Sequence, residues 1–116
     1  MNKISGIRFA GIINKQGRKI SGGFNPDVTP LEKDVKKLEM LFMETALDYS
    51  MRKEFDKSLG EIKAIVSYRS KTNIITIIHG ENFLLLSAEP ELNTAKVIQM
   101  AVHNLPDVKT LEIAIH

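Results

Sequence analysis

The feature that most constrains this fold is the stretch from residue 31 to residue 58, which contains neither glycine nor proline. Before it, Thr29-Pro30-Leu31-Glu32 places a threonine N-cap, a proline at the first helical position and a glutamate three residues after the cap. Gly60 offers a stop after Leu59. We therefore predict one helix over residues 31–58, roughly 40 Å long and longer than a small domain needs for its own core.

The predicted helix carries two apolar stripes on nearly opposite sides. The first should face the domain's own sheet and consists of Leu31, Val35, Leu38, Phe42, Ala46 and Tyr49. The second, called the methionine stripe below, consists of Met40, Met43, Leu47 and Met51. A helix that is apolar on two sides needs two surfaces to cover it, and thioether side chains suit adaptable contacts. The methionine stripe predicts a partner helix, with a second layer of the same chain as the alternative.

Composition indicates one ordinary globular domain spanning residues 1–116, with its core in residues 6–105. The chain has 116 residues, of which 43% are hydrophobic and 26% charged. The absence of cysteine excludes disulfides and thiolate chemistry. No run approaches the roughly 20 apolar residues of a membrane span, and the N-terminus lacks the apolar segment of a secretory signal. We expect a cytoplasmic protein without membrane contact.

Short β-prone runs surround the predicted helix. Residues 7–14 and 18–24 should form a hairpin around Lys15-Gln16-Gly17, with Gly11, Gly22 and Gly23 at bulges or close backbone approaches. Residues 61–69, 73–79 and 82–88 predict a three-stranded meander, whose last two members are apolar on both faces and belong at the sheet centre.

A second helix should run from an Asn93 cap to about His103, covering the sheet face that the long helix leaves open. Its predicted apolar stripe is Ala95, Ile98, Val102 and Leu105. Residues 106–116 form a C-terminal extension in which residues 110–116 alternate like a terminal strand. The predicted fold class is an α/β (α+β) sandwich in the order strand, strand, helix, three strands, helix.

Basic residues crowd the N-terminal hairpin, where residues 1–24 contain no acid. These cations are Lys3, Arg8, Lys15, Arg18 and Lys19. They either form a patch for an acidic partner or keep a solvated hairpin edge from aggregating, and we favour the second reading.

Motifs that carry chemistry are missing. His79, His103 and His116 are scattered without metal-ligand spacing, and the serines lack a GxSxG context. Carboxylates on the long helix alternate with lysine and arginine as solvent-side pairs. Neither a GxxxxGK[ST] loop nor a GxGxxG turn is present, and no nucleic-acid recognition motif occurs. We predict no catalytic residue, cofactor, metal or nucleic-acid partner.

Two segments resemble the roadblock or dynein light-chain-like family, a profilin-like α/β sandwich with a five-stranded antiparallel sheet. Residues 11–21 resemble its opening hairpin, and residues 80–89 resemble the turn and last strand before its closing helix. The resemblance, which points to an archaeal member, covers approximately residues 6–105. It implies a non-catalytic protein that dimerises through the central helix and the following strand. By position, the dimer surface would be Met40, Met43, Leu47, Met51, Ile62, Ala64, Val66 and Tyr68.

Two functions follow from these observations. The first is a dimeric adaptor or regulatory scaffold of roadblock type that contacts a small Ras-like GTPase or another protein, as the resemblance implies. The alternative is a PAS- or profilin-like module that senses a small molecule. The alternative predicts a roomy apolar pocket between the sheet and a helix, where a solidly packed core would argue against it.

Overall fold

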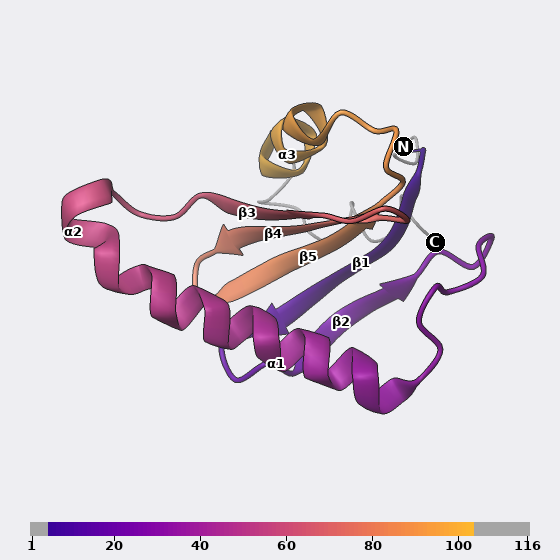
Figure 1. Ribbon diagram of the computed structural model, residues 1–116, viewed down its shortest axis with the longest axis horizontal. Helices are drawn as coiled ribbons and strands as arrows, with labels where there is room; N and C mark the ends of the chain where they lie inside the picture. Colours follow the sequence, from indigo (N-terminus) through magenta and orange to yellow (C-terminus); the bar gives the residue numbers. More distant parts are fainter. Residues whose placement is uncertain (1–4, 104–116) are drawn as a thin grey trace.

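Five antiparallel strands form one sheet between two helices in the computed structural model, which describes residues 5–103 (Figure 1). The strands are β1 (Ile7–Asn14), β2 (Lys19–Phe24), β3 (Ala64–Tyr68), β4 (Asn73–His79) and β5 (Asn82–Ala88), arranged in the order β2-β1-β5-β4-β3. Helix α1 (Val35–Arg52) crosses one face of the sheet, and α3 (Thr94–His103) lies over the other. The predicted α+β class, element order and placement of the two helices are confirmed.

Strand β5 is the centre of the molecule and separates two hydrophobic clusters. It pairs with β1 on one side and with β4 on the other, and Phe83 to Leu86 are all at most 2% exposed. Phe83 and Leu85 pack toward α1, whereas Leu84 and Leu86 pack toward α3. Because both faces are covered, this strand is apolar at every central position, as the sequence predicted.

The hairpin between β1 and β2 has the predicted geometry. The Asn14 side-chain oxygen accepts hydrogen bonds from the backbone N–H groups of Gln16 and Arg18, at 3.0 and 2.9 Å. Gly17 follows with φ +82°, a left-handed conformation that glycine adopts without steric cost. The pairing register shifts between Ile12 and Ile13, which is not at the glycines named in the sequence analysis. The predicted close backbone approach is confirmed at Gly22, where an added Cβ atom would lie 2.2 Å from the Ala10 carbonyl oxygen.

The long helix starts four residues later than predicted, and this is a correction. Asp34, not Thr29, is the N-cap: its backbone is extended and its carboxylate accepts from the backbone N–H of Lys36 at 2.9 Å. Glu32 accepts from the backbone N–H of Asp34 at 3.2 Å and so stabilises the preceding loop instead of closing a capping box. Aspartate caps a helix at least as well as threonine, and residues 31–34 gain no burial from joining the helix.

The other end of the long helix is where the sequence placed it. A 3-10 turn, η1 (Lys53–Phe55), and the short helix α2 (Asp56–Leu59) continue α1 almost without interruption. The helical run ends at Gly60, whose φ is +86° and whose N–H donates to the Asp56 carbonyl at 2.9 Å. Within residues 5–103 no helix is long and apolar enough to cross a membrane.

Helix α3 begins at the predicted cap but buries a different stripe. The Asn93 side chain accepts from the backbone N–H of Lys96 at 3.1 Å. Val97 and Ala101 are buried against the sheet and Ile98 is partly buried, whereas Ala95 and Val102 are exposed. The buried stripe therefore differs from the predicted one, because this short helix is apolar on several sides and its sequence pattern alone does not select the side that packs. Leu105 and the predicted strand at 110–116 lie outside the described residues.

Candidate interaction surface

Helix α1 contacts its own sheet through the middle of the first predicted stripe. Phe42 and Ala46 are buried, and Leu38 and Tyr49 pack beside them. The Phe42 ring stacks on Phe9 with centroids 5.9 Å apart, and Tyr49 meets Phe83 edge-on at 5.0 Å. The first residues of the stripe are different: Leu31 and Val35 are 50% and 65% exposed, which corrects the prediction that they face the core.

The methionine stripe lies on the exposed side of α1. Met40, Met43, Leu47 and Met51 are between 61% and 67% exposed. Phe55 and Leu59 follow Met51 at intervals of four residues and are 58% and 79% exposed, so apolar surface continues along η1 and α2. The sequence prediction missed this extension, although the four-residue spacing was a readable signal. Contiguous exposed apolar surface of this kind marks an interaction site more often than isolated apolar residues do.

The hairpin turn borders the methionine stripe on one side. A Cβ atom added to Gly17 would lie 2.7 Å from the Cα of Met43, so the turn packs directly on α1 there. Lys15, from the same turn, is 5.7 Å from the centroid of the Tyr49 ring and pairs with Glu81 at 3.4 Å. The other side of α1, carrying Leu41, Thr45 and Asp48, faces β3 instead.

The β3 residues of the predicted interface have a different environment. Ala64 and Val66 pack against the cluster beneath α3, and the Tyr68 hydroxyl lies 2.7 Å from the Thr94 hydroxyl of the segment that starts α3. Ile62 precedes the strand and is half-buried. The structure therefore places the methionine stripe and the side chains of Ala64, Val66 and Tyr68 on opposite faces of the sheet.

What β3 leaves available is its outer edge. It pairs with β4 along its length, from Ala64 opposite Ile77 to Tyr68 opposite Asn73, and within residues 5–103 no strand pairs with its other side. An uncovered edge presents unpaired backbone N–H and C=O groups, which can pair with another strand.

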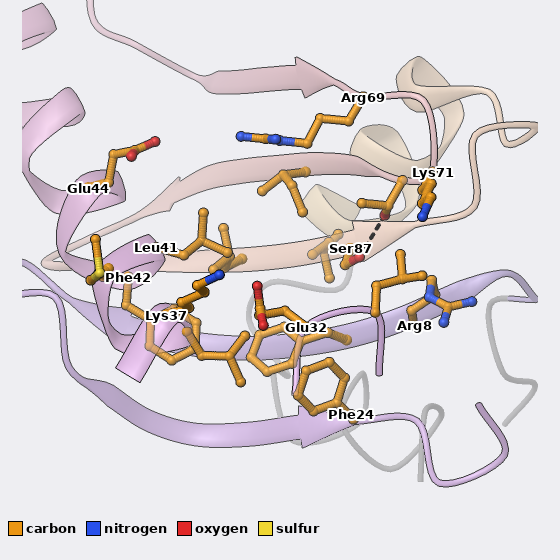
Figure 2. Close-up of a pocket in the computed structure, with 18 of the residues that line it drawn as sticks. Arg8, Phe24, Glu32, Lys37, Leu41, Phe42, Glu44, Arg69, Lys71 and Ser87 are labelled. Carbon is orange, nitrogen blue, oxygen red and sulfur yellow. Dashed lines mark hydrogen bonds between the residues drawn. The ribbon is translucent and has the colours of Figure 1, made fainter. Parts of the chain in front are cut away.

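A groove opens on the α1 side of the sheet, next to the turn between β3 and β4, and Figure 2 shows its lining. Its volume is about 530 Å³. Half-buried apolar side chains form part of its floor and wall, namely Phe24, Leu38, Leu41 and Ile74. Charged side chains surround the opening, namely Arg8, Glu32, Lys37, Glu44, Arg69 and Lys71. Of these charged residues, the sequence analysis named only Arg8 in a possible binding patch, because the loop before α1 and the β3–β4 turn are far apart in the chain.

Arg8 has a structural role at this opening. Its guanidinium donates to Glu89 at 2.7 Å and to the backbone carbonyl of Thr29 at 2.5 Å. These bonds join β1 to the segment after β5 and to the loop before α1. A partly buried arginine with two such partners holds the loop in place.

Comparison with known proteins adds evidence for the fold. No known protein family and no curated protein matches this sequence. A Roadblock/LC7 domain from Streptomyces avermitilis matches with a TM-score of 0.69 and 14% identity, covering 90% of this chain and 84% of that one. The gliding protein MglB from Thermus thermophilus matches with a TM-score of 0.70 and 16% identity, covering 94% of this chain and 78% of that one. This chain has the roadblock fold.

Another structural neighbour is an MglB with a tetrameric arrangement. It matches with a TM-score of 0.68 and 16% identity, covering 94% of this chain and 77% of that one. At such low identity the likeness establishes the roadblock fold and leaves the function of this chain to its own residues.

Few polar side chains are buried in the described part of the chain. Among residues 5–103, the buried polar side chains are Thr72, Asn73 and Thr76, none of which is ionisable. The same residues contain no group of three histidine, aspartate or glutamate side chains that could hold a metal ion.

Proposed function

We propose that this protein is a non-catalytic, single-domain adaptor or regulatory scaffold of roadblock type that acts as a homodimer in the cytoplasm. The methionine stripe on α1 carries the proposal, because its four large apolar side chains are each more than 60% exposed. Fully burying one side chain of this size is worth about 1.5–3 kcal/mol, so covering the stripe would favour association.

The free edge of β3 supports self-association independently. In a two-fold dimer the same edge of each copy can meet its equivalent, and two such strands can continue one sheet across the interface. A single two-fold interface that includes both the β3 edge and the methionine stripe gives the proposed homodimer, whereas two separate interfaces would join more than two chains. The tetrameric arrangement of the MglB neighbour is consistent with this possibility for the roadblock fold.

Sedimentation of the purified protein tests the proposal. We expect a dimer or larger assembly at tens of micromolar, and a monomer at that concentration would contradict it. Met43→Asp with Leu47→Asp should lower the association state, because the interface would have to bury two carboxylates. Lys96→Asp is a matched control, since it changes the net charge by the same amount on exposed α3. If the double variant sediments like the wild type, the methionine stripe is not an interface.

A small Ras-like GTPase is the partner that we propose for the assembly, on the strength of the roadblock fold and the sequence resemblance. Affinity purification from the native cell, with the tagged full chain, tests this. A GTPase enriched with the wild type supports the proposal. Enrichment of other proteins without any GTPase would leave the adaptor role standing and remove this partner.

A second candidate function is a small-molecule sensor, and the groove favours it. The sensor hypothesis required a roomy apolar pocket between sheet and helix, and a groove of about 530 Å³ lies there. This volume falls within the range of pockets that take small ligands.

A further inference from the structure

The groove beside the β3–β4 turn exists because α1 covers only part of its sheet face. The buried contacts of α1 reach β1 and β5, through residues such as Phe9 and Phe83, whereas Ile74 on β4 is only half-buried. The result is an open cavity whose apolar lining comes from α1 on one side and from the sheet strands β1, β2, β4 and β5 on the other (Figure 2). An apolar surface of this shape fits an alkyl or aryl group better than a polar ligand.

Unpaired cations stand around the same opening. Lys37, Arg69 and Lys71 line the groove, and none of them lies within 4.0 Å of a carboxylate in the described part of the chain. Figure 2 shows Arg69 reaching from the turn toward α1, and Lys37 directed into the groove from α1. Two carboxylates line the same groove: Glu44 on α1, toward which the Arg69 side chain extends in Figure 2, and Glu32, which accepts a hydrogen bond from its own loop. The β3–β4 turn itself contributes two cations, Arg69 and Lys71, and no carboxylate to the lining.

The Thr72 and Ser87 hydroxyl groups beside Lys71 have no free proton to donate to an anion. Thr72 donates its single hydroxyl proton to the Ala88 carbonyl at 2.9 Å, so at the 2.7 Å contact between the two hydroxyls Ser87 must be the donor. Ser87 has then used its own proton and can only accept a further hydrogen bond. Donors for an anion come instead from Arg69 and Lys71, of which the guanidinium can bind a carboxylate through two parallel bonds.

We propose that the groove binds a free amphipathic carboxylic acid. Its alkyl chain lies on Phe24, Leu38, Leu41 and Ile74, and its carboxylate pairs with Arg69 and Lys71 at the turn. This inference rests on the second candidate function, and it specifies the chemical class of the ligand.

Calorimetric titration of the full-length protein with decanoate, below its micelle-forming concentration, tests the inference. We expect saturable binding of one decanoate per chain. Arg69→Ala with Lys71→Ala should weaken it by about tenfold or more, because hydrogen bonds between charged groups are lost. Arg18→Ala with Lys19→Ala removes the same charge from the exposed hairpin and should leave affinity unchanged. Leu41→Glu should weaken binding by placing a carboxylate on the apolar wall.

Decanol has the same chain length and no charge, so it distinguishes the carboxylic-acid inference from the broader proposal of a small-molecule function. It should bind at least about tenfold more weakly than decanoate, by the same charge argument. Equal affinities would overturn the carboxylate assignment while leaving a small-molecule function in place. If neither compound binds saturably, the carboxylate assignment and the small-molecule function are both overturned. Decanoate binding that falls as protein concentration rises would show that a second copy of the chain fills the groove, and would also overturn the inference.

Discussion

Gly22 is the residue whose identity the backbone constrains most tightly. Its φ is +89°, and an added Cβ atom would lie 2.2 Å from the carbonyl oxygen of Ala10 on the paired strand. Two independent effects therefore exclude a side chain: the left-handed conformation, and the close approach of β1 and β2. Gly80 has a positive φ as well, but nothing lies within 4 Å of its would-be Cβ.

The pair provides a matched test. Gly22→Ala should lower the free energy of unfolding by more than about 2 kcal/mol, since a clash is added to the strain. Gly80→Ala should cost about 1 kcal/mol from conformation alone. Urea denaturation followed by circular dichroism measures both. Equal losses would mean that the two strands can separate at Gly22 without penalty.

At the scale of elements, α1 shows how far local signals reach. Its C-terminal stop at Gly60 and its core contacts at Phe42 and Ala46 are where the sequence pattern predicted them. Its start is not, because two capping signals compete and Asp34 lies nearer to the buried part of the helix than Thr29 does. Leu31 before the helix and Val35 in its first turn are 50% and 65% exposed, so this end of the helix makes no core contact that would favour an earlier start.

Capping variants distinguish the two possible starts. Asp34→Ala should destabilise the protein by about 1 kcal/mol, because the backbone N–H of Lys36 loses its acceptor. Thr29→Ala should have an effect below about 0.5 kcal/mol, as expected for an exposed residue away from a cap. Thermal unfolding of the two variants beside the wild type is the measurement. A larger loss at Thr29 than at Asp34 would favour the earlier helix start.

At the scale of the whole molecule, the uncovered surfaces of α1 and β3 are those expected of one subunit in a larger assembly. The sheet is buried on both faces at β5, yet within residues 5–103 the outer edge of β3 has no partner strand and one side of the long helix is exposed. Stability should then depend on assembly, because association stabilises the folded state by mass action.

Thermal unfolding measured at several protein concentrations tests whether stability depends on assembly. The melting temperature of the wild type should rise between about 1 and 100 µM, as expected for a linked association. The variant carrying Met43→Asp and Leu47→Asp should show a smaller rise, and Lys96→Asp should behave like the wild type. A melting temperature that is independent of concentration in the wild type would argue against a stabilising assembly.

The sequence by itself determined the elements whose evidence is local: the strands from their β-prone runs, the hairpin from its Lys15-Gln16-Gly17 turn, the helix stop from Gly60 and the second cap from Asn93. It also identified a second apolar stripe on the long helix. Only the tertiary structure decided that α3 buries Val97 and Ala101, and that Ala64 and Val66 face α3. It alone brought Arg69 and Lys71 together with Lys37 around one groove. These features depend on which surfaces approach each other across the sheet, and such contacts between distant segments have no signature in a local pattern.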